Sequence, residues 1–166
     1  MIVYCDIDIC RRDIFPFIHR ELTVEESAAD YEFELNGMFE LEKVLNFVRE
    51  DGYYPTFQEK ASYLICSIAG SQYFSNGNKR LSIMVLIKFL GLNKIPMKQF
   101  SEEDYQSQLK EYFPLSAWEE KENIQAPHAK FLYNLAILIG DRTQWGDMKF
   151  SDVKQYVAEI FKYLYL

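Results

Sequence analysis

Residues 81–92 read LSIMVLIKFLGL, the longest apolar stretch in the chain. Placed on a helix, these side chains leave no continuous polar stripe, and a helix that is apolar nearly all round must be surrounded by other helices. The stretch is too short to cross a bilayer, and Lys88 interrupts it. It therefore predicts a central buried helix over 78–90, which Gly91 ends.

Capping and spacing signals on both sides of this stretch predict further helices. The capping-box pattern, a threonine followed three residues later by a glutamate, occurs twice. It predicts one helix over 24–32, after Thr23, and another over 57–71, after Thr56. Apolar spacing or a polar cap predicts the remaining helices, over 40–50, 102–113, 128–139 and 151–164. No repeat or flexible linker divides the chain, so we expect a compact all-α bundle forming a single domain over 1–166.

Two segments do not follow the helical pattern. Residues 33–40 read FELNGMFE, and Asn36-Gly37 between short alternating runs is the strongest local signal for a β-hairpin. A plain turn between helices is the alternative for this segment. Residues 2–9 read as a short strand or as an extended arm.

Composition and charge exclude several classes of function. Lysine and arginine number 18 against 25 aspartates and glutamates, a net charge of −7. An acidic chain of this kind argues against nucleic-acid and anionic-membrane partners, which need positive charge. The only two histidines, His19 and His128, speak against a multi-histidine metal site. Three cysteines without CxxC spacing, and a start without a basic signal region, favour a reduced, cytoplasmic setting.

The basic residues are unevenly distributed along the acidic chain. Residues 57–100 hold six basic residues and a single acidic one, Glu59. This segment indicates a localised anion site, with a chance clustering of solvated lysines as the alternative.

The connection before the central helix, residues 71–80, reads SQYFSNGNKR. A glycine-containing turn there delivers the N-terminus of a buried helix, where free N–H groups and the positive end of the helix dipole converge. Asn78 is the expected cap of this helix. Lys79 and Arg80 follow in its first turn, where cations are unfavourable unless they meet an anion, and phosphate is the natural one.

The segment FSNGNKR, Phe74 to Arg80, resembles the core of the Fic/Doc (death-on-curing) motif, HxFx(D/E)(G/A)N(G/K)R, and the resemblance extends over 35–95. It implies a compact all-α fold and an ATP-dependent transfer of AMP or phosphate onto a protein hydroxyl. In that scheme the motif's histidine is the general base, its acid holds Mg²⁺, and the residues that follow cradle the phosphates. The family pattern also includes a hairpin flap, which would fall on Leu35, Asn36, Gly37 and Met38.

The positions that match the motif are those that bind phosphate, and the positions that depart from it are the catalytic ones. Phe74 matches the anchor of the loop, and the phosphate-binding positions fall on Ser75, Gly77, Asn78, Lys79 and Arg80. Gln72 stands where the histidine belongs, and Asn76 stands where the acid belongs. A glutamine amide cannot accept a proton near pH 7, and a positioned general base contributes about 10²–10⁴ in rate. Asparagine offers Mg²⁺ only a neutral oxygen, so weak Mg²⁺ binding, or none, is expected.

Three functional hypotheses follow. The first is a Fic/Doc-like domain that retains ATP binding, lacks ordinary transfer chemistry, and acts by binding an antitoxin-like partner or a protein target in a toxin–antitoxin or regulatory setting. The second is a working adenylyltransferase or phosphotransferase with altered catalytic residues. The third is a non-catalytic protein-interaction domain. Neither His19 nor His128 lies in a recognisable motif, so neither is expected to replace the missing base.

Overall fold

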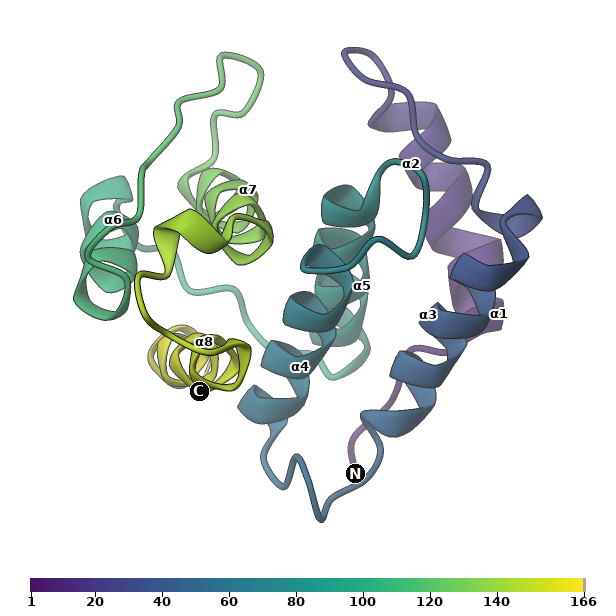
Figure 1. The fold of residues 1–166 in the computed structure, drawn as a ribbon, viewed down its shortest axis with the longest axis horizontal. Helices are drawn as coiled ribbons and strands as arrows, with labels where there is room; N and C mark the ends of the chain where they lie inside the picture. The colour runs from purple at the N-terminus through teal and green to yellow at the C-terminus, as the bar shows by residue number, and fades with distance from the viewer. Residues whose placement is uncertain (166) are drawn as a thin grey trace.

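A computed structural model describes residues 1–165, in which the apolar stretch lies at the centre of a helical bundle (Figure 1). It forms α5, Asn78–Leu92, which packs against α4 (Phe57–Ala69), α7 (Pro127–Gly140) and the N-terminal helix. The side chains of Leu81, Val85 and Phe89 are fully buried. The predicted all-α class is confirmed, and the regular structure of the described residues is entirely helical. One face of α5 is buried as expected, whereas Ile83, Met84 and Ile87 on the other side are only partly buried.

The helices after residue 56 follow their sequence signals closely. α4 begins at Thr56, whose hydroxyl accepts a hydrogen bond from the N–H of Glu59 while the Glu59 carboxylate accepts one from the N–H of Thr56. α6 begins in the same way after Ser101. The remaining boundaries are α6 Glu102–Tyr112, the 3₁₀ turn η3 Arg142–Gln144 and α8 Phe150–Leu164. α8 lies along α4, and α6 packs against α7.

The N-terminal segment is an extended arm followed by a helix. The arm, residues 1–6, is held by Asn93, whose side chain both accepts from the N–H of Val3 and donates to its carbonyl, each at 2.8 Å. The helix runs through α1 (Ile7–Ile9), a π-helical segment η1 (Cys10–Ile14) and α2 (Phe15–Glu21). Pro16 explains the π-helical segment, because a proline clashes with the carbonyl four residues earlier and the wider turn relieves that clash.

The predicted hairpin at 33–40 is wrong. A 3₁₀ turn, η2 (Tyr31–Phe33), leads directly into α3 (Leu35–Phe47), so the expected flap residues Leu35, Asn36, Gly37 and Met38 form the first turn of a helix. Gly37 is required by packing: a methyl group there would lie 2.6 Å from Cδ1 of Phe74 and would also clash with the Tyr73 carbonyl. The glycine that resembled a hairpin turn therefore lets α3 approach the loop before α5.

Two further boundaries differ from expectation. No helix forms over 24–32; residues 22–30 are an irregular segment, and the Thr23 hydroxyl donates to the carbonyl of His19 at the end of α2. α5 continues through Gly91 and ends at Leu92, with Asn93 as its C-cap. Lys94, with φ of 55°, takes the left-handed position predicted for Gly91 and completes a Schellman ending. Among residues 1–165 no helix combines the length and apolarity needed to span a membrane.

Candidate functional site

The loop between α4 and α5 is fixed by its own side chains. The Asn78 amide donates to the carbonyl of Phe74 at 2.8 Å and accepts from its N–H at 3.0 Å. Phe74 is buried, with its ring 4.9 Å from that of Tyr31. The predicted cap is therefore corrected: Gly77 occupies the N-cap position, and Asn78, as the first helical residue, closes the loop behind it.

Gly77 is the one position of this loop that only glycine fits. Its φ is 80°, and a methyl group there would clash with the hydroxyl of Tyr31. That hydroxyl donates to the Gly77 carbonyl at 3.0 Å. Burial raises the pKa of Tyr31 to about 12, so its hydroxyl keeps this proton throughout the neutral range.

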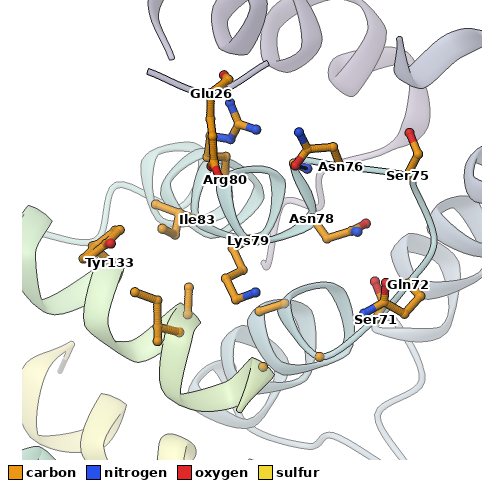
Figure 2. A pocket seen from close by; sticks show the side chains of 16 residues that line it. Glu26, Ser71, Gln72, Ser75, Asn76, Asn78, Lys79, Arg80, Ile83 and Tyr133 are labelled. Atoms are coloured by element: carbon orange, nitrogen blue, oxygen red, sulfur yellow. Dashed lines mark hydrogen bonds between the residues drawn. The ribbon is translucent and has the colours of Figure 1, made fainter. Parts of the chain in front are cut away.

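A cavity of about 480 Å³ opens where the end of α4, the start of α5 and α7 meet (Figure 2). It brings together most of the predicted site: Gln72, Ser75, Asn76, Gly77, Asn78, Lys79 and Arg80 all line it. Phe74 lies behind the loop in the core, and the predicted flap residues 35–38 do not line the cavity. Residues of α5 and α7 (Ile83, Ala136 and Ile137) form an apolar wall, to which Tyr133 adds a ring.

Lys79 lies in the middle of this cavity. Its aliphatic end is so close to Gly140 that a methyl group there would come within 2.8 Å of Cε. Gly140 ends α7 and Ala69 ends α4, so the ammonium lies near two helix C-termini, whose exposed carbonyls favour a cation. Lys79 belongs to none of the ion pairs formed among residues 1–165.

Arg80 is occupied by backbone carbonyls. Its guanidinium donates to the carbonyls of Leu22 (2.7 Å), Glu26 (2.7 Å) and Ser27 (2.5 Å). Asn76 donates to the same Ser27 carbonyl at 2.6 Å. The first turn of α5 thus holds the irregular segment 22–27, which we call the strap, over one end of the cavity.

The geometry of Asn76 does not fit a metal ligand. Its amide nitrogen is bonded to the strap, and its Oδ1 accepts from the N–H of Gly77 at 2.7 Å. No group of three or more histidine, cysteine, aspartate or glutamate side chains in residues 1–165 is arranged to hold a metal ion. Asn76, the residue at the expected magnesium position, therefore uses its side chain for hydrogen bonds that hold the loop and the strap.

Gln72 and Glu26 lie at opposite ends of the cavity in Figure 2, with Lys79 between them. Gln72 is exposed, and its neutral amide provides no base. Glu26 is the carboxylate that sequence analysis missed, because its capping-box spacing assigned it to a helix that does not form. No local signal in the sequence placed Glu26 at the cavity.

The remaining charged and titratable candidates lie elsewhere. His19 is exposed on α2, and the His128 ring bonds to the Tyr165 hydroxyl at 2.6 Å; neither lines the cavity. The basic segment 57–100 does not converge on one site either. Lys60 is buried against Asp51 and the Val48 carbonyl, and Lys88 pairs with Asp13. Of the six basic residues in that segment, only Lys79 and Arg80 line the cavity.

Compared with protein-family models, curated proteins and solved structures, the chain shows no significant match. The kind of ligand that the cavity could bind is therefore inferred from its lining residues. The N–H groups of residues 78–80 begin α5 and have no carbonyl one turn earlier to bond, and two cations lie beside them. That wall suits an anion, and the wall opposite suits an apolar ring.

Proposed function

We propose that the cavity at the start of α5 binds a phosphate-bearing ligand, a nucleotide such as ATP, and that the protein acts through binding. One observation carries this proposal. Lys79, Arg80 and the helix N-terminus share a cavity with an apolar wall, and its volume of about 480 Å³ falls within the ordinary range of small-molecule sites. A nucleotide has both parts that such a cavity would select, a charged phosphate chain and a planar base.

The identities of Gln72 and Asn76 favour binding over transfer. Neither supplies a proton acceptor, and both atoms of the Asn76 amide are committed to the loop and the strap. The resemblance of residues 74–80 to the Fic/Doc motif supports a nucleotide as the ligand. It also supports a protein partner, either an antitoxin-like protein or a target whose binding depends on nucleotide occupancy.

Isothermal titration calorimetry with ATP and with inorganic pyrophosphate, each with and without Mg²⁺, tests the proposal. We expect both to bind without Mg²⁺, adenosine to bind far more weakly, and Lys79→Met to weaken ATP binding about tenfold because it removes a charged hydrogen-bond donor. Lys98→Met, in the same basic segment but away from the cavity, is the matched control. Absence of heat from wild-type protein with either anion, in both conditions, would refute the proposal.

Glu26 favours a second candidate function, a transferase with relocated acid–base chemistry. Its side chain lines the cavity beside Arg80 (Figure 2). In such an enzyme the proton of a protein hydroxyl would pass to the Glu26 carboxylate while the new O–P bond forms and ADP or pyrophosphate leaves. Phosphoryl transfer depends mainly on positioning and charge stabilisation, so a displaced base is compatible with activity.

ATP labelled separately at the α- and γ-phosphates, incubated with the protein and cell lysate, distinguishes the two functions. A transferase should label protein, lose that activity in Glu26→Gln, and keep it in Glu25→Gln, since Glu25 does not line the cavity. Binding of ATP with no transfer of either label rules out the second candidate and leaves the first intact.

A further inference from the structure

A second cavity, of about 580 Å³, lies between α3 and α4. It shares no lining residue with the cavity at the start of α5. Two glutamates, Glu40 and Glu50, and three aromatic side chains, Phe47, Tyr63 and Tyr73, form most of its lining. This combination of carboxylates and rings differs in character from the cationic site already described.

The aromatic side chains belong to a continuous cluster. The ring of Phe47 lies 5.8 Å from that of Tyr63, which in turn stacks against Tyr54 at 4.3 Å. Aromatic faces carry partial negative charge and attract cations within about 6 Å. Burial raises the pKa of Tyr63 to about 12, so its ring stays neutral and its hydroxyl stays protonated at physiological pH.

This cluster already holds an alkylammonium group on the side facing α8. Nζ of Lys154 lies 5.7 Å from the ring centre of Tyr54, 5.9 Å from that of Tyr63 and 5.6 Å from that of Phe150. The side facing the cavity offers the ring of Tyr63 again, together with Phe47. The protein therefore shows, with its own lysine, the kind of group that these rings accept.

The carboxylates make the cavity net negative. Lys43, which also lines it, pairs with Glu40 at 3.2 Å. The carboxylate of Glu50 enters none of the ion pairs that residues 1–165 form, which leaves one negative charge uncompensated beside the rings. An anion is disfavoured there, and a neutral ligand would leave that charge without a counterpart.

We propose that the cavity between α3 and α4 binds an alkylammonium group, which rests against the rings of Phe47 and Tyr63 with Glu50 as its counter-ion. The positive charge is the recognised feature, and two chemical sources present it: a quaternary ammonium compound and the primary amine of a lysine side chain. The site is independent of the nucleotide proposal, because the two cavities have separate walls.

NMR titration of the aromatic signals with choline tests the site, with sodium chloride holding the ionic strength constant. The neutral alcohol 3,3-dimethyl-1-butanol, which has the shape of choline without its charge, is the ligand control. Nα-acetyl-lysine methylamide is the second arm and represents a lysine side chain. We expect saturable shifts of the Phe47 and Tyr63 signals with at least one of the two cations and none with the alcohol.

Substitutions at two exposed positions test the assignment within the protein. Phe47→Leu keeps an apolar side chain but removes the ring, and Glu50→Gln removes the charge; each should weaken binding about two- to fivefold. Glu122→Gln, an exposed carboxylate outside the cavity, should leave the affinity unchanged. Circular dichroism of each variant establishes that it folds. Saturation by choline alone assigns a quaternary ligand, and saturation by the lysine analogue alone assigns a primary amine. No saturation by either cation, or equal shifts with the alcohol, overturns the proposal.

Discussion

Two helical glycines of this protein meet opposite surroundings. A methyl group on Gly37 in α3 would clash with the Tyr73 carbonyl and the Phe74 ring, whereas one on Gly91 in α5 would meet no atom within 4 Å. Both residues have helical backbone, so the difference lies in packing alone. The pair separates the cost of crowding from the intrinsic preference of a helix for alanine.

Gly37→Ala should lower the free energy of unfolding by about 1–3 kcal/mol, the usual cost of overpacking. Gly91→Ala should raise it by about 0.5–1 kcal/mol, because alanine is the better helix former and nothing obstructs its methyl group. Urea unfolding of the two variants and the wild type measures both effects. Changes of the same sign in the two variants would contradict the close approach of α3 to the loop.

The sequence pattern at Gly37 was misleading for a physical reason. Asn-Gly between alternating residues is a local signal, and the partner that requires the glycine, Phe74, lies far along the chain. The anchor role of Phe74 was expected from the resemblance of the loop to the family motif, and the turn at Gly77 from the glycine itself. Nothing in the local sequence indicated that the Asn76 amide would donate to the strap and accept from the N–H of Gly77.

At the scale of whole elements, the two threonine capping signals had different outcomes. Thr56 caps α4, while Thr23 extends the end of α2 by donating to His19. The residues after Thr23 form no helix because Arg80 and Asn76 hold the carbonyls of Glu26 and Ser27 in an irregular path. Tertiary hydrogen bonds outweighed a local preference worth about 1 kcal/mol.

Thr56→Ala should therefore lower the free energy of unfolding by about 1 kcal/mol, the typical value of an N-cap. Thr23→Ala should cost clearly less, because its hydroxyl caps no helix N-terminus. Chemical denaturation of the two variants compares the same substitution in two contexts. Equal losses would indicate that the segment after Thr23 has helical structure in solution.

Arg80 donates three of the hydrogen bonds that hold the strap, and Asn76 donates another. Arg80→Ala removes three hydrogen bonds to carbonyls of residues 22–27 and should speed amide hydrogen exchange across 22–30. The free energy of unfolding should fall by about 1–3 kcal/mol, as expected when carbonyls lose a charged donor. Arg20→Ala, an exposed arginine paired with its neighbour Glu21, is the control and should change neither quantity appreciably. Unchanged exchange in Arg80→Ala would show that Arg80 does not hold the strap.

Tyr165, the residue after α8, connects the end of this helix to α7 and α4. The His128 ring and the Tyr165 hydroxyl are 2.6 Å apart, and Gln58 on α4 donates to the Tyr165 carbonyl at 2.7 Å. Burial lowers the pKa of His128 below its usual 6.5. A proton therefore binds the unfolded chain more tightly than the folded one.

The free energy of unfolding should accordingly fall as the pH drops below 6.5, with a slope of at most about 1.4 kcal/mol per pH unit from this group. His128→Gln should flatten the profile in that range, and His19→Gln, which changes an exposed histidine, should preserve it. Urea titrations between pH 5 and 7.5 measure the three profiles. An identical slope in His128→Gln would assign the acid sensitivity to other groups.

At this scale the sequence predicted the fold class and most helices, because the apolar stretch of α5 and the caps of α4 and α6 are strong local signals. The loop and the first turn of α5, which the sequence singled out as a candidate anion site, form one wall of the cavity. The other wall was hidden, since Ile137 and Gly140 read only as core and as a helix end. A pocket made by distant elements becomes visible when their packing is known.

The two walls of the cavity come from segments that are synthesised at different times, which has a consequence for folding on the ribosome. α4 and α5 are consecutive and pack directly against each other, so a nascent chain can form this pair soon after residue 92 leaves the ribosome. Tyr133, Ile137 and Gly140 emerge later, and until then the cationic turn faces solvent with no opposite wall. We expect the complete cavity to form only after the α7 segment has left the ribosome, because a shorter nascent chain lacks the wall that Tyr133, Ile137 and Gly140 provide.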